Sequence, residues 1–347
     1  MKAIVKYAVG DGCIGLRDVP EPQVGPGQVK IKVEAAGICG SDLHIWHGDI
    51  MIPVRPPVVL GHEFSGIIVA VGPGVTRWRE GQRVTAENSY HVCGECDYCM
   101  TGNYNLCEQR LATGYAFDGA FAPYCVVPQE RVHLLPDSVD FVTGALSDPS
   151  ACAYRAVCEK ARVQAGDTVL ITGPGPMGLF CTQYAKANGG LVILVGMEPD
   201  RARLRLGKEM GADHVLDAST DNVEERVAQL TSRKGVDIVL ECSGAAPAAN
   251  QALRLLRKTG RFTQVGIFGK PLVFDLDQVL YKEIELNAIF SHKYMAWEKA
   301  IALAGQGRIV ARPLVTDILP LSQWEQGFRR FETKEALKVI FEPQRAF

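Results

Sequence analysis

The sequence predicts an α/β protein that combines a β-rich, partly closed barrel-like domain with a doubly wound parallel sheet. Its 347 residues exceed the size at which a single hydrophobic core usually stops growing, so two domains are expected. Up to about residue 150, short apolar strands alternate with turns rich in glycine and proline, a texture typical of a barrel or sandwich. Beyond that point apolar strands alternate with helical stretches, which indicates βα units and a parallel sheet.

The composition is that of a globular chain, and it argues against several classes of function. Hydrophobic residues make up 47% and charged residues 22%, and the formal net charge is −2. A chain so close to neutral has no general attraction to nucleic acid or to an anionic membrane. No apolar run reaches the roughly 18–20 residues that a membrane-spanning helix requires. The first residues, Met1–Lys6, predict a strand and not a signal peptide, so we expect a cytoplasmic protein with neither nucleic acid nor a membrane as partner.

Eleven cysteines are many for this length, and in a reducing compartment clustered cysteines indicate metal sites or catalysis more often than disulfides. Cys93, Cys96, Cys99 and Cys107 form the pattern C-x2-C-x2-C-x7-C. Four thiolates from one short lobe close a tetrahedron around zinc, which predicts a structural site. Four unrelated cysteines in a turn-rich loop are the alternative. An iron–sulfur cluster fits poorly, because no proline follows the fourth cysteine.

A second candidate metal site involves the adjacent pair His62 and Glu63, which stands between Gly61 and Gly66, and Cys39, 23 residues upstream. Cysteine, histidine and glutamate are a competent ligand set for zinc. A catalytic zinc typically takes three protein ligands and keeps one position open for water or substrate. Taken alone, a histidine and a glutamate flanked by glycines also fit a surface turn. The choice between a zinc site and a turn therefore depends on the other motifs in the chain.

The strongest cofactor signal lies in the second half of the chain, where the apolar strand Thr168–Thr172 runs directly into Gly173-Pro174-Gly175-Pro176-Met177-Gly178. A helix is predicted from Leu179 to Asn188, so the G-x-G-x-x-G pattern has a strand before it and a helix after it. In this setting the glycines allow the tight turn, the approach of the backbone to a pyrophosphate and the packing of helix on strand. The pattern predicts a dinucleotide site at Gly173, Gly175, Pro176, Met177 and Gly178.

An acidic residue that follows the second strand of this βαβ unit, Glu198, predicts which dinucleotide binds. A carboxylate at this place accepts hydrogen bonds from the ribose hydroxyls and repels a 2′-phosphate, which favours NAD over NADP. Arg201 and Arg203 lie nearby and would be the residues to meet a 2′-phosphate, although a solvated helix face explains them equally simply. We therefore expect NAD as the cofactor, with Glu198 and Arg203 beside it.

Taken together, these motifs resemble those of the zinc-containing medium-chain dehydrogenase/reductase superfamily, and most closely its sorbitol (polyol) and L-threonine 3-dehydrogenase branch. The resemblance rests on Gly37-Ile38-Cys39-Gly40-Ser41-Asp42-Leu43-His44, Gly61–Gly66, the four-cysteine lobe and Gly173–Gly178, in that order. It implies a GroES-like catalytic domain of residues 1–152 and 295–347 around a Rossmann domain of residues 153–294. It also implies an active site in the cleft between the domains and a homodimer or homotetramer.

The resemblance assigns the metal sites residue by residue. Cys39 and His62 match the catalytic zinc ligands, and Glu63 matches the adjacent glutamate, which ligates the zinc or exchanges with water. Asp148 stands where the polyol and threonine branch has a glutamate, one methylene longer. It is expected to reach the metal directly or through water, with Cys152 as the alternative ligand. The four-cysteine lobe matches the structural site, so two zinc ions per chain are implied.

Further residues match positions around the substrate. Ser41 and His44 match those that contact the substrate hydroxyl and pass its proton outward, whereas His47 fits a surface position. His292 and Lys293 fall where polyol dehydrogenases carry an arginine–tyrosine pair that meets the substrate. This difference argues against sorbitol itself as the substrate.

The implied activity is zinc-dependent transfer of a hydride between NAD and a secondary alcohol of the polyol, sugar or cyclitol type. Zinc would act as a Lewis acid that lowers the pKa of the alcohol. An L-threonine 3-dehydrogenase or another alcohol dehydrogenase is the nearest alternative. A zinc-free quinone reductase and a non-catalytic nucleotide-binding protein are further alternatives, and the pair Cys39 and His62 counts against both.

Overall fold

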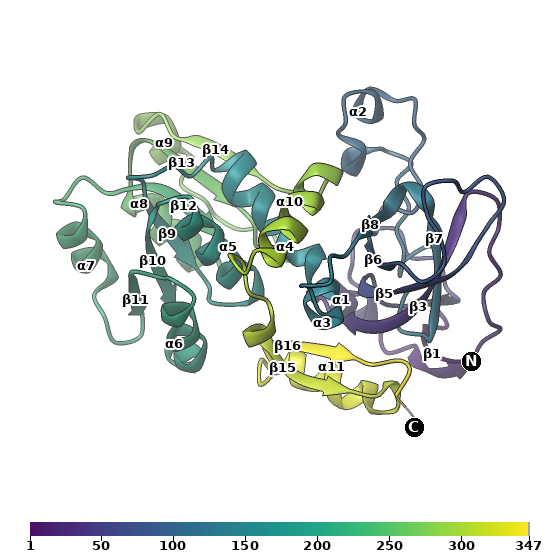
Figure 1. The fold of residues 1–347 in the computed structure, drawn as a ribbon. Coiled ribbons are helices and arrows are strands. Elements are labelled where there is room, and N and C mark those ends of the chain that lie inside the picture. Colours follow the sequence, from purple (N-terminus) through teal and green to yellow (C-terminus); the bar gives the residue numbers. More distant parts are fainter. Residues whose placement is uncertain (346–347) are drawn as a thin grey trace. The chain divides into compact units, whose positions relative to one another are not determined.

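The structure, a computed structural model, describes residues 1–345, which fall into two compact units (Figure 1). The first unit joins residues 1–148 to the C-terminal segment that begins at residue 292, and the inserted unit comprises residues 149–291. These boundaries lie four and three residues earlier than those expected from the sequence, 152/153 and 294/295. Because the inserted unit interrupts the first in sequence, both ends of the chain contribute to one fold.

The first unit is built on a seven-stranded sheet with the order β15-β16-β3-β5-β6-β8, in which β7 also pairs with β3, and on a three-stranded sheet, β2-β1-β4. β3 is the central strand, because β5, β7 and β16 all pair with it. Register shifts at Lys30/Ile31 and Val33/Ala35 mark bulges that bend β3, as a barrel-like sheet requires. The strands are β1 (Lys2–Lys6), β2 (Ile14–Asp18), β3 (Gln28–Gly37), β4 (Val58–Val59), β5 (Glu63–Val71), β6 (Arg83–Ala86), β7 (Tyr124–Pro128), β8 (Val132–Leu134), β15 (Val315–Leu319) and β16 (Lys338–Phe341).

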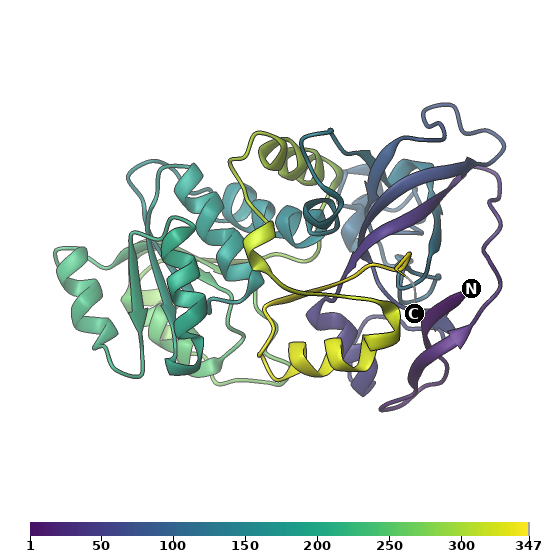
Figure 2. The ribbon, with the colours of Figure 1, turned by 60° about the horizontal axis from the view of Figure 1, so that its bottom comes forward.

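The C-terminal segment completes the core of the first unit. β16 pairs with the end of β3, and Figure 2 shows the yellow C-terminal strands beside the purple N-terminal ones. Phe121 packs edge-to-face on Phe328 and Phe341, with ring centroids 6.1 and 5.2 Å apart, and all three rings are buried. The helices of this unit are α1 (Gly40–His47), α2 (Asp97–Met100), α3 (Phe141–Ala145), α10 (Tyr294–Gly305) and α11 (Trp324–Glu332).

The inserted unit is a six-stranded parallel sheet with the order β11-β10-β9-β12-β13-β14. The chain starts at β9 in the middle and winds outward to both edges, which confirms the predicted doubly wound sheet. Among residues 1–345, no helix combines the length and the apolar character that crossing a membrane requires. The strands are β9 (Thr168–Thr172), β10 (Leu191–Gly196), β11 (His214–Asp217), β12 (Val236–Glu241), β13 (Leu256–Gln264) and β14 (Glu285–Ala288); the helices are α4 (Ser147–Tyr154, which starts at the end of the first unit), α5 (Pro176–Ala187), α6 (Arg201–Glu209), α7 (Val223–Leu230), α8 (Ala246–Leu255) and α9 (Leu276–Tyr281).

Helix α5 begins at Pro176, three residues before the predicted start at Leu179. Proline suits the first helical position, because its φ is already helical and its missing N–H would have no partner there. Gly173 adopts φ +84°, and a Cβ at Gly178 would lie 2.0 Å from the carbonyl oxygen of Gly173. The turn between β9 and α5 therefore requires glycine at both positions.

Candidate functional site

Cys39, His62 and Glu63 come together where β3 and β5 pair. Gly37, the last residue of β3, stands opposite Glu63, the first residue of β5, in the antiparallel register. Cys39 follows β3 by two residues, so this register brings its thiol to His62 and Glu63. One ligand atom from each of the three residues lies within 4.8 Å of the other two.

Glu63 is held in place by a glycine and a lysine. A Cβ at Gly37 would lie 2.7 Å from Oε2 of Glu63, so only glycine leaves room for the carboxylate. Lys338 of β16 donates to the same Oε2, and at 2.7 Å to the carbonyl oxygen of Ile38, and both charged side chains are buried. Burial opposes the lysine charge, but the Glu63 carboxylate raises the pKa of Lys338. The ion pair therefore engages one carboxylate oxygen and leaves Oε1 for another partner.

The surroundings of His62 fit a metal ligand. Its Nδ1 lies 3.6 Å from Oδ1 of Asp42, and neither atom has a hydrogen-bond partner among residues 1–345 although both are buried. Asp42 is itself fixed, because its Oδ2 accepts the backbone N–H of Cys39 at 2.9 Å. A metal-ligating histidine commonly directs its second ring nitrogen at a carboxylate. The donor set and this arrangement both fit zinc with one position open.

Asp148 lies outside the group formed by Cys39, His62 and Glu63. Its Oδ2 is instead 3.0 Å from Nε2 of His292, and both side chains are buried. Burial raises the pKa of Asp148, but His292 and His62 more than offset this and lower it. The carboxylate thus stands near the candidate metal site in ionised form. Cys152, the alternative ligand, belongs to the inserted unit.

Ser41 has a partner that the sequence did not reveal. Tyr115 donates its hydroxyl to Oγ of Ser41 at 2.7 Å, and the tyrosine ring centroid lies 5.2 Å from that of His62. No motif surrounds Tyr115, and 74 residues separate it from Ser41. His44 is 40% exposed, and its Nδ1 lies 3.0 Å from Asp49.

His47 and Lys293, which were also considered in the sequence analysis, contact residues outside the candidate metal site. His47 lies at the surface, 3.0 Å from Asp11 and 2.7 Å from Glu332. Lys293 donates to Oδ1 of Asn103 at 2.5 Å, so it contacts the four-cysteine lobe.

The four cysteines of the lobe gather their sulfur atoms within 4.8 Å of one another. Sγ of Cys93 lies 3.6 Å from that of Cys107 and 3.9 Å from that of Cys99. With zinc–sulfur bonds of about 2.3 Å, the sulfurs of a tetrahedral site stand about 3.8 Å apart, so the spacing fits zinc. The backbone N–H groups of Glu95 and Cys96 lower the pKa of Cys93 to about 7, whereas burial raises the pKa of Cys99 to about 12, so the spacing of the sulfur atoms is what supports a metal site.

In the inserted unit a pocket of about 470 Å³ lies at the carboxyl ends of β9, β10 and β12, the edge at which parallel sheets bind ligands. Gly173 of the predicted dinucleotide motif lines it. Asp200 and Arg254 also line it. No sequence motif marks Arg254, whereas Asp200 follows Glu198 within the same turn. Glu198 is exposed and Arg203 half-buried, and neither lines this pocket.

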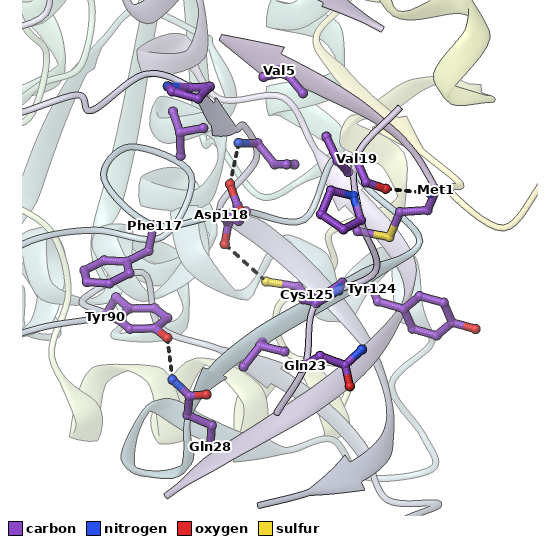
Figure 3. A pocket seen from close by; sticks show the side chains of 17 residues that line it. Met1, Val5, Val19, Gln23, Gln28, Tyr90, Phe117, Asp118, Tyr124 and Cys125 are labelled. Atoms are coloured by element: carbon purple, nitrogen blue, oxygen red, sulfur yellow. Dashed lines mark hydrogen bonds between the residues drawn. The ribbon is translucent and has the colours of Figure 1, made fainter. Parts of the chain in front are cut away.

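A further pocket of about 420 Å³ lies in the first unit (Figure 3). Its walls include the stacked rings of Tyr90 and Phe117, whose centroids are 3.9 Å apart, and Asp118. None of the candidate metal ligands lines it, so it is separate from the candidate site.

Comparison with known proteins shows that this chain matches two family models of dehydrogenases. The family model of the alcohol dehydrogenase GroES-like domain matches residues 25–137, and that of the zinc-binding dehydrogenase matches residues 176–306. The chain is 44% identical over 344 residues to a sorbitol dehydrogenase of Halalkalibacterium halodurans, covering 99% of both chains. It is 40% identical over 343 residues to a D-arabitol-phosphate dehydrogenase of Enterococcus avium, covering 99% of this chain and 97% of that one. A crystal structure described as a zinc-binding dehydrogenase of Sinorhizobium meliloti bound to NADP superposes with a TM-score of 0.91 at 33% identity, covering 99% of each chain.

We expect each of the two candidate metal sites to bind and lose its zinc ion independently of the other. Wild-type protein loaded with zinc and desalted should retain about two zinc ions per chain by mass spectrometry, because each site supplies a complete ligand set. Cys107→Ser should lose the ion of the lobe, and His62→Ala the other, whereas Cys13→Ser, outside both sites, should keep two. A wild-type content of one or none would contradict the two-site interpretation.

Proposed function

The chain belongs to the zinc-binding alcohol dehydrogenase family, and we propose on this basis that it transfers a hydride between NAD and a secondary alcohol of the polyol, sugar or cyclitol type. The observation that carries the proposal is the convergence of Cys39, His62 and Glu63 beside β3 and β5. The substrate class is supported by the sorbitol and D-arabitol-phosphate dehydrogenases, which are 44% and 40% identical to this chain.

The reaction requires hydride and proton transfer from one alcohol. The alcohol carbon passes a hydride to C4 of the nicotinamide, and the oxygen loses a proton, so each turnover yields a ketone, NADH and one proton. Cys39, His62 and Glu63 would hold the zinc, which supplies Lewis-acid polarisation of the alcohol oxygen when bound. Lys338 holds Oε2 of Glu63 and so sets the direction of the remaining carboxylate oxygen.

Ser41 is the residue that we assign to the substrate hydroxyl. Its Oγ already accepts a hydrogen bond from Tyr115, so its own hydrogen is available to donate to the substrate oxygen. His44 lies on the same helix, and its side chain is 40% exposed, so its ring can exchange protons with solvent. Tyr115 therefore acts by positioning Ser41.

His62→Ala should abolish turnover while leaving cofactor binding intact. An NAD-coupled screen of polyols, inositols, sugar alcohols and L-threonine, followed by NADH absorbance, identifies the best substrate of the wild type. Loss of the metal centre should then reduce kcat by about 10³-fold or more, since Lewis-acid stabilisation is worth several kcal/mol. NAD affinity should change little, because the dinucleotide motif lies in the other unit. Retained turnover in His62→Ala, with normal turnover in a His91→Ala control, would contradict the proposal.

Glu198 is proposed as the residue that selects NAD. Glu198→Ala should lower the ratio of kcat/KM for NAD over NADP by about tenfold or more, which corresponds to roughly 1.4 kcal/mol. Glu209→Ala, at an exposed position of helix α6, is the matched control and should leave the ratio unchanged. An unaltered ratio in Glu198→Ala would remove this residue from cofactor selection.

Self-association is supported by exposed apolar side chains on the inserted unit. Val273, Leu280 and Tyr281 are 89%, 69% and 76% exposed, and β14 is an edge strand of the sheet. Exposed apolar side chains and an unpaired strand edge are each typical of a subunit interface. Sedimentation velocity should show a dimer or tetramer that Leu280→Asp dissociates, whereas Leu106→Asp, in the cysteine lobe, should not. A monomeric wild type would contradict this.

A further inference from the structure

A buried carboxylate stands at the edge of the parallel sheet where the proposed dinucleotide site lies. Glu241 is the last residue of β12, and its side chain is completely buried. In the parallel register it stands opposite Thr172, the last residue of β9. Thr172 directly precedes Gly173, the first glycine of the predicted dinucleotide motif. The carboxylate therefore lies where two of the strands that border the pocket end.

The carboxylate of Glu241 accepts hydrogen bonds from both strand ends. Its Oε1 accepts the hydroxyl of Thr172 at 3.1 Å. The same oxygen accepts the backbone N–H groups of Ser243 at 2.9 Å and of Gly244 at 3.1 Å, and also the hydroxyl of Ser243. Its Oε2 lies 3.2 Å from the backbone nitrogen of Gly244. One side chain thus joins the end of β9 to the turn that follows β12.

The turn that Glu241 holds packs directly on the glycine turn of the dinucleotide motif. A Cβ at Gly173 would lie 2.7 Å from Cα of Ser243. Gly244 adopts φ +64°, and a Cβ there would lie 2.4 Å from the carbonyl oxygen of Ile267, so this position requires glycine. Because the two turns are in contact, a displacement of Ser243 would displace Gly173.

Both turns form part of the pocket at this edge of the sheet. Thr172, Gly173 and Ser243 line the pocket of about 470 Å³, whereas Glu241 does not. Apart from its chain neighbours, no atom of residues 1–345 would lie within 4 Å of a Cβ at Gly175, so the backbone there is open to a pyrophosphate. Glu241 therefore reaches a bound dinucleotide only through the residues that it holds.

We propose that Glu241 is a positioning residue for the dinucleotide: its carboxylate fixes Ser243 and Gly244 against the end of β9 and keeps the pocket in the shape that binds NAD. This role rests on the proposed function, in which NAD binds at the glycine turn. Backbone groups that are fixed before the cofactor arrives remove an ordering cost that binding would otherwise have to meet. Glu241 therefore acts on the affinity for NAD and not on hydride transfer.

Packing alone does not account for a carboxylate at this place. An apolar side chain would fill the same space without the cost of removing a carboxylate from water. The hydrogen bonds from Thr172, Ser243 and Gly244 are what an apolar side chain could not accept. The residue type is thus explained by the turn that it holds.

A second carboxylate on the same strand represents a general stabilising role. Asp237 lies four residues before Glu241 on β12. Its Oδ2 accepts the backbone N–H of Thr168, the first residue of β9, at 2.8 Å, and its Oδ1 lies 2.6 Å from Nε of Arg257. Asp237 thus joins the same two strands at their amino ends, and it does not line the pocket. It is therefore the matched control for Glu241.

Glu241→Ala and Glu241→Gln test the positioning role in the zinc-loaded, full-length protein. The Kd for NAD, measured by isothermal titration calorimetry, should rise by about tenfold or more in Glu241→Ala, because several buried hydrogen bonds are lost together. The rise should be smaller in Glu241→Gln, which keeps one acceptor oxygen. KM for NAD should rise in parallel, while kcat at saturating NAD stays within about twofold of wild type. Asp237→Asn should keep the wild-type Kd, even where its Tm falls as far as that of Glu241→Ala.

Hydrogen exchange of the cofactor-free protein tests the positioning itself. The backbone amides of Ser243 and Gly244 should exchange about tenfold faster in Glu241→Ala than in wild type, because their acceptor is removed. In Asp237→Asn these two amides should exchange as in wild type. A merely stabilising role predicts instead that both variants accelerate exchange to a similar extent along β9 and β12.

The possible failures are distinguishable. If wild type binds NAD and folded Glu241→Ala binds it with the same Kd, Glu241 does not position the site, and the proposed function stands. Should Glu241→Ala not fold, Glu241→Gln and Thr172→Val decide, since Thr172→Val removes one hydrogen bond and keeps the side-chain shape; a wild-type Kd in both would contradict the role. If wild type binds no NAD, the proposed function fails and the role of Glu241 with it.

Discussion

The pairing of β3 with its neighbours is the constraint on which the candidate site depends. The register that sets Gly37 opposite Glu63 brings Cys39 to His62, and the register that sets Gly37 opposite Ile340 brings Lys338 to Glu63. A slip of one residue in either pairing would turn these side chains to the opposite face of the sheet. The positions of the candidate metal ligands and of the lysine that holds one of them therefore depend on one sheet, which is formed by segments from both ends of the chain.

The sequence predicted those features that local patterns encode. The parallel sheet, the barrel-like unit and the family resemblance are confirmed, because strand periodicity and the motifs around Cys39, His62 and Gly173 are read from consecutive residues. The start of helix α5 was predicted three residues too late, because the prediction did not consider that proline is favoured as the first residue of a helix.

Contacts between distant segments could not be predicted in this way. Lys338 lies 275 residues from Glu63, and Tyr115 lies 74 residues from Ser41, so no spacing rule connects them. His292 was considered as a substrate residue, yet the structure buries it between Asp148 and Glu87. Only the folded structure shows that Asp148 has a histidine as its partner.

The division of the chain assigns the two parts of the proposed chemistry to different units. The first unit supplies the candidate metal ligands and Ser41, whereas the inserted unit supplies the glycine turn at which a dinucleotide would bind. Ion pairs such as that of Lys338 and Glu63 are expensive to bury, which is consistent with a functional role for the charges around the site. The central claim is thus that a metal ion binds where β3 and β5 meet.

Anomalous diffraction at the zinc absorption edge, from crystals of the zinc-loaded protein, tests that claim most directly. The account predicts two peaks per chain, one bonded to Sγ of Cys39 and the ring of His62 and the other among the four cysteines of the lobe. A map with a peak in the lobe alone, at full zinc loading, would contradict it.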